Sequence, residues 1–338
     1  MMIKRLITAI TLVFLLLLAP SPGLSSAPDS TVSDSTPQRP CSVAIGVVLI
    51  DAGNFDYPNA TFQSTFWIWS VSENPDLDAL INLDIRNAVA TEVITDISST
   101  EEGEHWHLQK IKGTFRNYWN LSKYPFDRQK LKIFLEEGEL GIQDFSYCID
   151  ADSRSYFHSP NIKGWTLESL NIETGSTQYE SNFGDPSLKG LETSDFAVAE
   201  ITVELRRSNW TSFWRITSGA FISLSLSLSS FLLSFKNFGL LSARFGLLGG
   251  SAFANVISIR NVSAKTGAVP YITFIDQIHL IPMLTIHLGL IISLWNLRIY
   301  NKSANVTKCD TIDKYSLLSI SSFSIISLVT IFSQVGGN

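Results

Sequence analysis

The chain has 338 residues, a formal net charge of −6, 45% hydrophobic residues and 17% charged residues, against about 25% charged residues in an average soluble domain. The apolar content and 11% aromatic residues exclude a disordered chain, and the lack of a strongly basic region excludes a protein that binds nucleic acid through one. Residues 28–210 carry a net charge of −14, whereas residues 211–338 carry +6. This asymmetry predicts two regions that face different solvents.

Residues 1–27 have the three parts of a secretory signal peptide. Lys4 and Arg5 precede an apolar run from Leu6 to Ala19, and the small residues Ser25-Ser26-Ala27 follow as a cleavage site. The alternative is an uncleaved N-terminal anchor. Residues 28–40 are rich in Ser, Thr, Asp and Pro and predict a flexible lead-in.

Residues 41–209 predict an extracytoplasmic antiparallel β-sandwich. Runs with β-branched, aromatic or alternating residues are separated by Gly, Pro, Asn and Asp clusters, and we expect strands at 42–51, 65–71, 110–118, 129–136 and 195–206. The alternation is cleanest in the last run. The region has no long stretch with the hydrophobic period of a helix. Many short strands with turns between them are typical of a sandwich.

Cysteine and histidine give open alternatives in this region. Cys41 and Cys148 either pair in an oxidising compartment or leave Cys148 as a buried free thiol, while Cys309 is expected to stay free. His105 and His107 share one strand face, but without a third ligand at a defined spacing we expect a solvated strand edge, even with Glu101, Glu102 and Glu104 nearby, and no metal site.

Four apolar stretches follow, and they predict a four-helix transmembrane domain over residues 210–335. The spans are expected at about 210–235, 245–261, 271–295 and 315–335; the first and third reach the roughly 20 residues that cross a bilayer, and the short, Gly-rich second ranks lowest. The connections after the first and third spans hold most of the Lys and Arg residues, including Lys236 and Arg244, so they are predicted to lie inside and the β-sandwich outside.

This layout resembles the pentameric ligand-gated ion channels, also called Cys-loop receptors. The residues that carry the resemblance are Tyr124-Pro125-Phe126-Asp127-Arg128-Gln129, which match the aromatic-Pro-aromatic-Asp pattern of the family's signature loop, and it is supported by Trp67-Ile68-Trp69, Trp165 and Arg206. Asn117 and Leu131 stand where animal members have the loop cysteines, as in the prokaryotic-type branch. From the residues alone, Pro125 makes a rigid turn and Phe126 anchors the loop in an apolar layer. The resemblance implies that Asp127 lies near Arg206 and that Pro125, Phe126, Asp127 and Arg206 couple the outer domain to the spans. The alternative is a surface turn with a solvated Asp127.

The resemblance also implies a ligand site under the hairpin between the last two strands, over about residues 175–194. Tyr179 and Phe183 flank its tip. The position that often holds Trp falls near Gly138, between Glu137 and Glu139, so an aromatic cage for an amine is in doubt. These carboxylates either bind a cation, respond to pH or form a solvated acidic loop.

In the family the second span lines the pore. With Arg244 at the inner mouth, helical spacing places Gly250, Phe253, Ile257 and Arg260 on one stripe with Gly246, and Phe253 and Ile257 would gate by dewetting. The opposite rotation would instead face Ser251, Asn255 and Ser258 to water. The acidic outer domain favours cations, the two arginines favour anions, and the lack of an inner carboxylate favours a weak preference for anions.

Asp276 and His279 are titratable residues inside the third predicted span, three positions apart on one helix face. We expect either that Asp276 pairs with Arg260 or Arg215 and His279 biases gating, or that they form static hydrogen bonds between helices. The predicted function is that of a homopentameric ligand-gated ion channel in the cell membrane, opened by a small ligand, a proton or a divalent cation. The alternative is a non-conducting receptor on the same scaffold. No enzyme motif is present, so we expect neither catalysis nor a cofactor.

Overall fold

The structure is a computed structural model that describes residues 41–158, 162–184, 186, 192–207, 210–234 and 238–336. The predicted signal peptide and lead-in lie outside the described residues. The chain divides into a β unit, which holds the described residues up to Asn120 and from Arg128 to Arg207, and a helical unit, which holds Leu121–Asp127 and the described residues from Trp210 onward.

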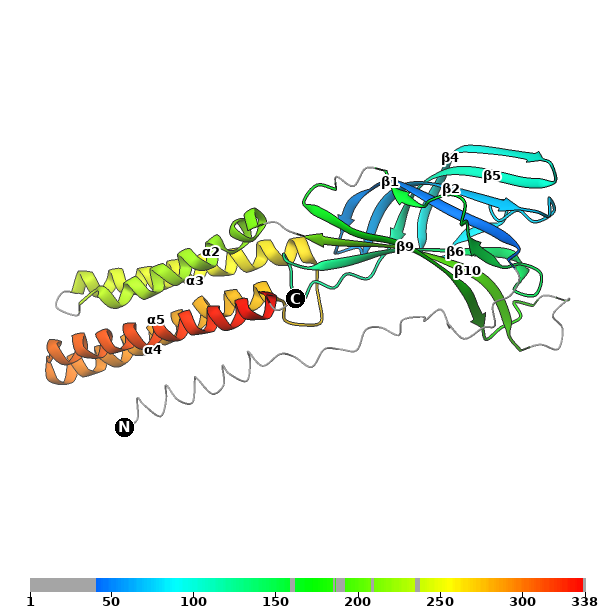
Figure 1. The fold of residues 1–338 in the computed structure, drawn as a ribbon. Helices are drawn as coiled ribbons and strands as arrows, with labels where there is room; N and C mark the ends of the chain where they lie inside the picture. Colours follow the sequence, from blue (N-terminus) through cyan, green and yellow to red (C-terminus); the bar gives the residue numbers. More distant parts are fainter. Residues whose placement is uncertain are drawn as a thin grey trace. The chain divides into compact units, whose positions relative to one another are not determined.

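The β unit contains two sheets (Figure 1). The first has the strand order β4-β5-β2-β1-β7, with β8 also paired to β1, and the second has the order β3-β6-β10-β9. The strands are β1 (Val43–Asp56), β2 (Thr61–Ser72), β3 (Leu83–Ile85), β4 (Ala88–Glu101), β5 (Glu104–Arg116), β6 (Arg128–Gly141), β7 (Tyr147–Ile149), β8 (Tyr156–Phe157), β9 (Trp165–Tyr179) and β10 (Ser194–Arg207). The long neighbouring strands are antiparallel, and only the short β7 and β8 run parallel to β1.

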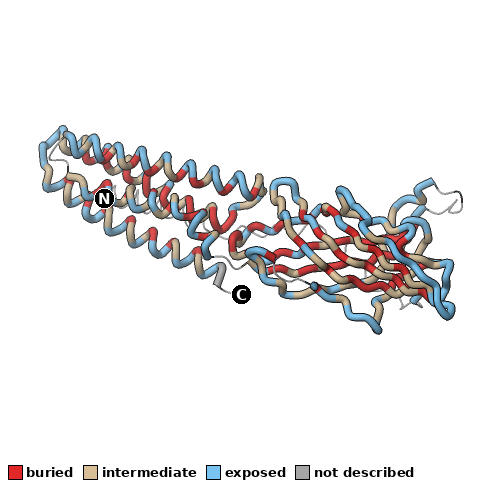
Figure 2. The backbone as a smooth tube through the Cα atoms, turned by 90° about the horizontal axis from the view of Figure 1, so that it is seen from above, coloured by how far each residue is buried: buried red, intermediate tan, exposed pale blue. Residues whose placement is uncertain are grey.

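Both sheets bury alternate residues, as the sequence pattern predicts. Phe66 and Ile111 of the first sheet and Ile133 and Ile201 of the second are at most 2% exposed. Along several strands, buried residues alternate with less buried ones (Figure 2). The five predicted strands are all present, and the sandwich-like arrangement is confirmed. Burying these side chains stabilises the unit by roughly 25 cal/mol per Å² of apolar surface.

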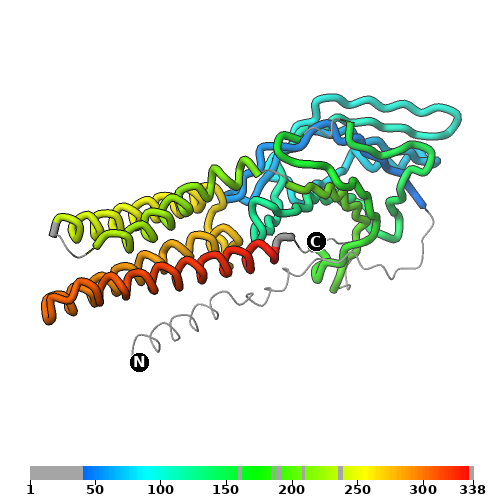
Figure 3. Tube along the Cα trace, turned by 60° about the vertical axis from the view of Figure 1, so that its left-hand side comes forward, coloured from blue at the N-terminus to red at the C-terminus, as the bar shows by residue number. Residues whose placement is uncertain are grey.

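Two long strands, β9 and β4, lie outside the five predicted ranges, and the sequence contains no local sign of β4. Strand β4 forms the edge of the first sheet, in the hairpin with β5 (Figure 3), and nearly all of its residues are exposed. Because neither face of β4 is covered, its sequence has no reason to alternate, and the period-two signal of a half-buried strand is absent.

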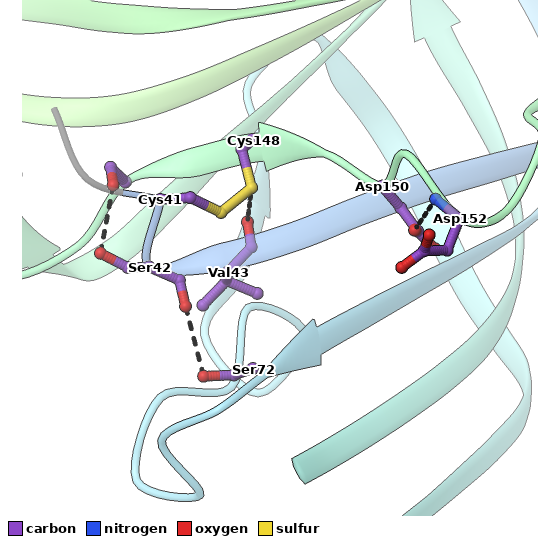
Figure 4. The surroundings of a disulfide bond; sticks show 8 residues. Cys41, Ser42, Val43, Ser72, Cys148, Asp150 and Asp152 are labelled. Carbon is purple, nitrogen blue, oxygen red and sulfur yellow. Dashed lines mark hydrogen bonds between the residues drawn. A yellow bond between two sulfur atoms is a disulfide. The ribbon is translucent and has the colours of Figure 1, made fainter. Parts of the chain in front are cut away.

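A disulfide links Cys41 to Cys148 (Figure 4), with their Cα atoms 5.6 Å apart. It resolves the alternatives left open by the sequence. Strand β7 lies parallel to β1 and places Cys148 beside Ala44, so the pairing of the two strands brings the cysteines together across 107 residues of sequence. Cys309 is free and buried, as expected.

The helical unit has four long helices and one short 3₁₀ turn. They are α2 (Trp210–Ser229), the 3₁₀ turn η2 (Ser230–Leu232), α3 (Phe238–Thr266), α4 (Phe274–Ser303) and α5 (Val306–Gly336). Helix α2 runs beside α3, and α4 beside α5 (Figure 1). Small residues permit close packing: a Cβ on Gly219 would approach Ser258 Oγ to 2.8 Å, and one on Gly289 would approach a Leu248 methyl to 2.8 Å.

Three of these helices are long and apolar enough to cross a membrane: α3, α4 and α5. The ranking from sequence was therefore wrong. The second predicted span qualifies because α3 extends to 29 residues, whereas α2, although 20 residues long, is made less apolar by Arg215 and several serines. The loop between the last two helices is also shorter than predicted, since only Ala304 and Asn305 separate α4 from α5.

Candidate functional site

An aromatic group lies where β9 and β10 lead into their hairpin. The Tyr179 ring centroid is 5.2 Å from that of Phe183 and 6.0 Å from that of Phe196, and the Phe183 and Phe196 centroids are 6.2 Å apart. Phe183 is 64% exposed. The structure thus brings the two predicted aromatic residues together and adds a third from β10.

Arg86 occupies the space beside these rings. Its Cζ lies 5.8 Å from the centroid of Tyr179 and 5.8 Å from that of Phe134, within the range of cation–π attraction. Its Nε pairs with Glu136 Oε2 at 3.4 Å, and its Nη1 donates to Thr177 Oγ1 at 3.0 Å. A cation of the chain itself therefore lies over the rings of Tyr179 and Phe134.

Glu136 is the buried acid of this group. The Tyr179 hydroxyl lies 2.9 Å from each of its carboxylate oxygens. Burial raises the pKa of Glu136, with the Tyr179 hydrogen bond and the Arg86 charge opposing the rise. Burial and the bond to Glu136 likewise raise the pKa of Tyr179. The charge of Glu136 is thus balanced in part by Arg86 at 3.4 Å.

The two predicted acids, Glu137 and Glu139, have other partners. Glu137 is 1% exposed, and its Oε1 accepts the backbone N–H groups of Glu139 and Leu140 at 3.1 and 3.3 Å. Glu139 Oε2 accepts from Asn82 Nδ2 at 2.6 Å. Burial raises the pKa of Glu137. The interpretation of Glu137 as part of a solvated acidic loop is wrong, because its side chain is buried and accepts hydrogen bonds from the backbone of the strand residues that follow it.

Gly138 is constrained by a neighbouring backbone. A Cβ at this position would lie 2.8 Å from the carbonyl oxygen of Asn82, and the Gly138 N–H donates to that same oxygen at 3.0 Å. A side chain therefore meets an immovable group here, which accounts for the missing aromatic residue.

Arg86, Glu136 and Phe196 were not singled out from the sequence. Glu136 was available as the neighbour of Glu137, and strand periodicity places the two on opposite faces of β6. Arg86 follows the three-residue strand β3, which is too short to leave a periodic signal.

The predicted signature loop belongs to the helical unit, although its flanking residues belong to the β unit. The Phe126 centroid lies 4.9 Å from that of Trp210, 5.5 Å from Phe213 and 5.9 Å from Phe274. Phe213 and Phe274 each lie 5.5 Å from Phe332 of α5. The prediction that Phe126 anchors the loop in an apolar layer is confirmed, and that layer is built from the ends of α2, α4 and α5.

Backbone bonds hold the same loop. The Phe274 N–H donates to the Ser122 carbonyl at 2.8 Å, and the Leu121 N–H donates to Tyr271 Oη at 2.9 Å. Pro125, which follows a cis peptide bond, and Asp127 are buried. Arg206 belongs to the β unit, where its Nε pairs with Glu168 at 2.8 Å. The pairing of Asp127 with Arg206 would join the two units, and it stays a prediction.

Helix α3 presents two different faces. Gly246, Gly250 and Arg260 are exposed together with Phe253 and Ile257, which are 69% and 43% exposed. The opposite face is buried against neighbouring helices: Ser223 donates to the Ser251 carbonyl at 2.7 Å, Asn255 donates to the His279 carbonyl at 3.2 Å, and Ser258 is 7% exposed. The sequence left two rotations of this helix open. In the structure, the face with Phe253 and Ile257 is uncovered and the face with Ser251, Asn255 and Ser258 is buried.

Arg244 does not belong to that stripe. It is fully buried and forms a two-pronged ion pair with Asp313 of α5, with Nη1–Oδ2 at 2.6 Å and Nη2–Oδ1 at 2.9 Å. Its Nε donates to Ser293 at 2.8 Å, and Asn296 donates to Asp313 at 2.8 Å, both from α4. The prediction of Arg244 as a free charge at the inner mouth is wrong, because the Asp313 carboxylate balances it. The same finding removes Arg244 from the charges that suggested anion preference.

Asp276 and His279, the two titratable residues of the third predicted span, form local hydrogen bonds. Asp276 caps α4: its Oδ2 accepts from the Thr273 backbone N–H at 2.9 Å and from Thr273 Oγ1 at 2.7 Å, and its own N–H donates back to Thr273 Oγ1. This replaces the expected pairing with Arg260 or Arg215. His279 lies 2.9 Å from Ser258 Oγ through Nε2 and 2.9 Å from the Ile275 carbonyl through Nδ1. His279 thus makes the static bond between helices that was the second alternative.

His105 and His107 do share one face of β5, but they do not form a solvated edge. His107 is 5% exposed, and both rings reach Asp78, a residue of the segment before β3. A third group of metal-ligand type is therefore present.

In comparisons with known proteins, the chain matches no protein-family model and no curated sequence.

Proposed function

We propose that the chain is a subunit of a homopentameric ligand-gated ion channel, in which the β unit binds a ligand and α3 lines the pore. The observation that carries the proposal is the placement of Leu121–Asp127. This loop continues directly into β6, which bears Glu136, yet its Phe126 ring packs on aromatic residues of α2 and α4. A shift of β6 is thereby passed through the chain itself to the ends of the helices.

The exposed stripe of α3 supports assembly around a pore. Phe253 and Ile257 leave apolar surface uncovered beside Gly246 and Gly250, while the opposite face of the same helix is buried and bonds to α2 and α4. A single copy gains no stability from exposing this apolar stripe. Copies arranged around an axis would turn the stripe toward a narrow lumen, where apolar rings gate by dewetting.

Four spans are part of the proposal, with α2 as the fourth. Its serines bond within the helix or to α3: Ser225 and Ser229 donate to the carbonyls four residues earlier, and Ser223 donates to α3. Satisfied hydroxyls lower the cost of placing a serine-rich helix in lipid. The N-terminal unit would then lie outside the cell membrane.

The gating stimulus is proposed to act at the Arg86–Glu136–Tyr179 cluster, either as a proton on Glu136 or as a small ligand that competes for Arg86. The cluster holds an acid with a raised pKa, a cation and three aromatic rings beside the hairpin.

Reconstitution into liposomes with a flux assay tests the proposal, using protons, calcium chloride and small primary amines as probes. We expect a stimulated flux that Phe126→Ala abolishes and that Tyr118→Ala, a change of an exposed aromatic residue in the β unit, leaves intact. Five-fold particles without flux under any probe would favour the non-conducting receptor instead. Particles without five-fold symmetry would reject the pentamer.

A further inference from the structure

We propose that Asp78, His105 and His107 form a divalent transition-metal site in the β unit, with Zn²⁺ as the best fit. The ligand atoms of the three side chains lie within 4.8 Å of one another. This site is separate from the Arg86–Glu136 cluster, and the proposal does not depend on channel function.

The inner atoms of the three residues converge on one point. His105 Nε2 lies 2.9 Å and His107 Nδ1 lies 2.7 Å from the same oxygen, Asp78 Oδ2. The other oxygen of Asp78 is already held by the Leu80 backbone N–H at 2.9 Å. All three side chains are shielded from water, with exposed fractions of 15% for His105 and 6% for both His107 and Asp78.

The outer nitrogen of each ring has its own partner on the neighbouring strand β4. His107 Nε2 lies 2.6 Å from Asp96 Oδ1, and His105 Nδ1 lies 2.9 Å from Thr100 Oγ1. Asp96 is itself held by Gln109 at 3.2 Å. Histidines that bind metals characteristically give their second nitrogen to a carboxylate or another acceptor, which fixes the tautomer and the ring orientation.

The hydrogen-bond count at His107 also favours a cation. A neutral imidazole has one N–H, whereas both carboxylates facing His107 can only accept. A metal bound to Nδ1 and Asp78 Oδ2 resolves this conflict, because the remaining Nε2–H then donates to Asp96. The alternative solution is a proton, which gives an imidazolium between two aspartates and no metal affinity.

The donor set selects the class of metal. Two imidazole nitrogens and one carboxylate oxygen suit Zn²⁺ and its neighbours in the first transition row, whereas Ca²⁺ and Mg²⁺ prefer oxygen ligands. Three protein ligands leave a fourth tetrahedral position for water. A tetrahedral ion with bonds of about 2.0–2.1 Å separates its ligand atoms by about 3.3 Å, so a small opening of the present contacts accommodates it.

Calorimetric titration of ZnCl₂ into the metal-stripped full-length protein in detergent tests the proposal. We expect one Zn²⁺ per chain, no competition by CaCl₂, and loss of binding in His105→Ala and His107→Ala. His158→Ala is the matched control, since His158 is an exposed histidine of the same unit. Wild-type binding no stronger than that of His107→Ala, or equal loss in His158→Ala, would overturn the site.

Two further measurements keep the test decisive should a histidine variant misfold. Asp96 is 58% exposed, so Asp96→Asn spares the core, and its loss as a partner of His107 is expected to weaken Zn²⁺ binding by about 10–100-fold. Co²⁺ added to the wild type is expected to give the visible absorption of a tetrahedral nitrogen–oxygen site. An octahedral spectrum or unchanged affinity in Asp96→Asn would favour the protonated, metal-free arrangement.

Discussion

The two units differ in how they handle charge. The β unit is strongly acidic, and several of its described ion pairs have exposed cations, such as Lys130–Glu204 and Arg128–Glu168. The helical unit has few charges, and Arg244–Asp313 is buried with every prong bonded. The comparison teaches that the helical unit balances a buried charge inside the unit, although other buried polar atoms there, such as Asn255 Oδ1 and Ser324 Oγ, have no hydrogen-bond partner among the described residues.

The largest expected effect comes from breaking the buried pair. Asp313→Asn leaves the Arg244 guanidinium without its counter-charge, and loss of one partner of a buried pair costs about 3–5 kcal/mol. We expect a strong fall in the thermal stability of the detergent-solubilised full chain, read by the loss of its monodisperse chromatographic peak.

Its control is the double variant Arg244→Met/Asp313→Leu. Because an apolar pair of similar volume avoids the desolvation of both charges, this variant is expected to recover most of the lost stability. A single variant as stable as the wild type would show that the pair does not hold the helices together.

In the β unit the strongest single constraint is covalent. Cys41→Ser opens a link across 107 residues of sequence, and removal of such a disulfide is expected to cost about 2–4 kcal/mol. Thermal unfolding of the full chain followed by near-UV circular dichroism measures it. Cys148→Ser and the double variant should show the same loss as Cys41→Ser, and additive losses would contradict a bond between the two.

A matched pair of serines sharpens the comparison within α2. Ser223 is fully buried and donates to the Ser251 carbonyl of α3, whereas Ser225 is exposed and donates to Phe221 of its own helix. Ser223→Ala is expected to cost about 0.6 kcal/mol, a typical value for a bond between membrane helices. Ser225→Ala should change the melting temperature less. A larger effect of Ser225→Ala than of Ser223→Ala would contradict a stabilising bond between Ser223 and α3.

The smallest effect concerns Glu136, one of the acids that the β unit buries. Burial raises the pKa of Glu136 above that of the unfolded chain, so the folded state binds the proton more tightly and loses stability as the pH rises through the raised pKa. Glu136→Gln mimics the protonated acid and escapes that loss. We expect the melting temperatures of variant and wild type to converge in acid and the variant to gain as the pH rises; a constant difference would contradict this.

Elements with a periodic hydrophobic pattern could be predicted from the sequence. Side-chain roles that depend on partners far along the chain could not. The alternation of Ile201, Val203 and Leu205 predicted the buried face of β10, because these residues are buried while Thr202 and Glu204 between them are not. The anchoring role of Phe126 followed from the signature loop. β4 left no pattern, because an edge strand with both faces exposed buries nothing regularly.

Individual polar residues were misread for a different reason. Arg244 near the start of a span looks like an interfacial charge until Asp313, 69 residues later, is placed beside it. The pair His105 and His107 lacked a third ligand because Asp78 comes from a loop 27 residues before His105. Such partnerships are set by packing, and a single sequence contains no local trace of them.

The position of Leu121–Asp127 has a consequence for construction of hybrid proteins. The helical unit is discontinuous in sequence, since this loop is made well before α2 and separated from it by five strands, β6 to β10. A graft joined at Arg207 would therefore pair foreign helices with a loop whose Phe126 was shaped for other aromatic neighbours. A working exchange has to transplant residues 121–127 along with the helices, as two pieces of a single module.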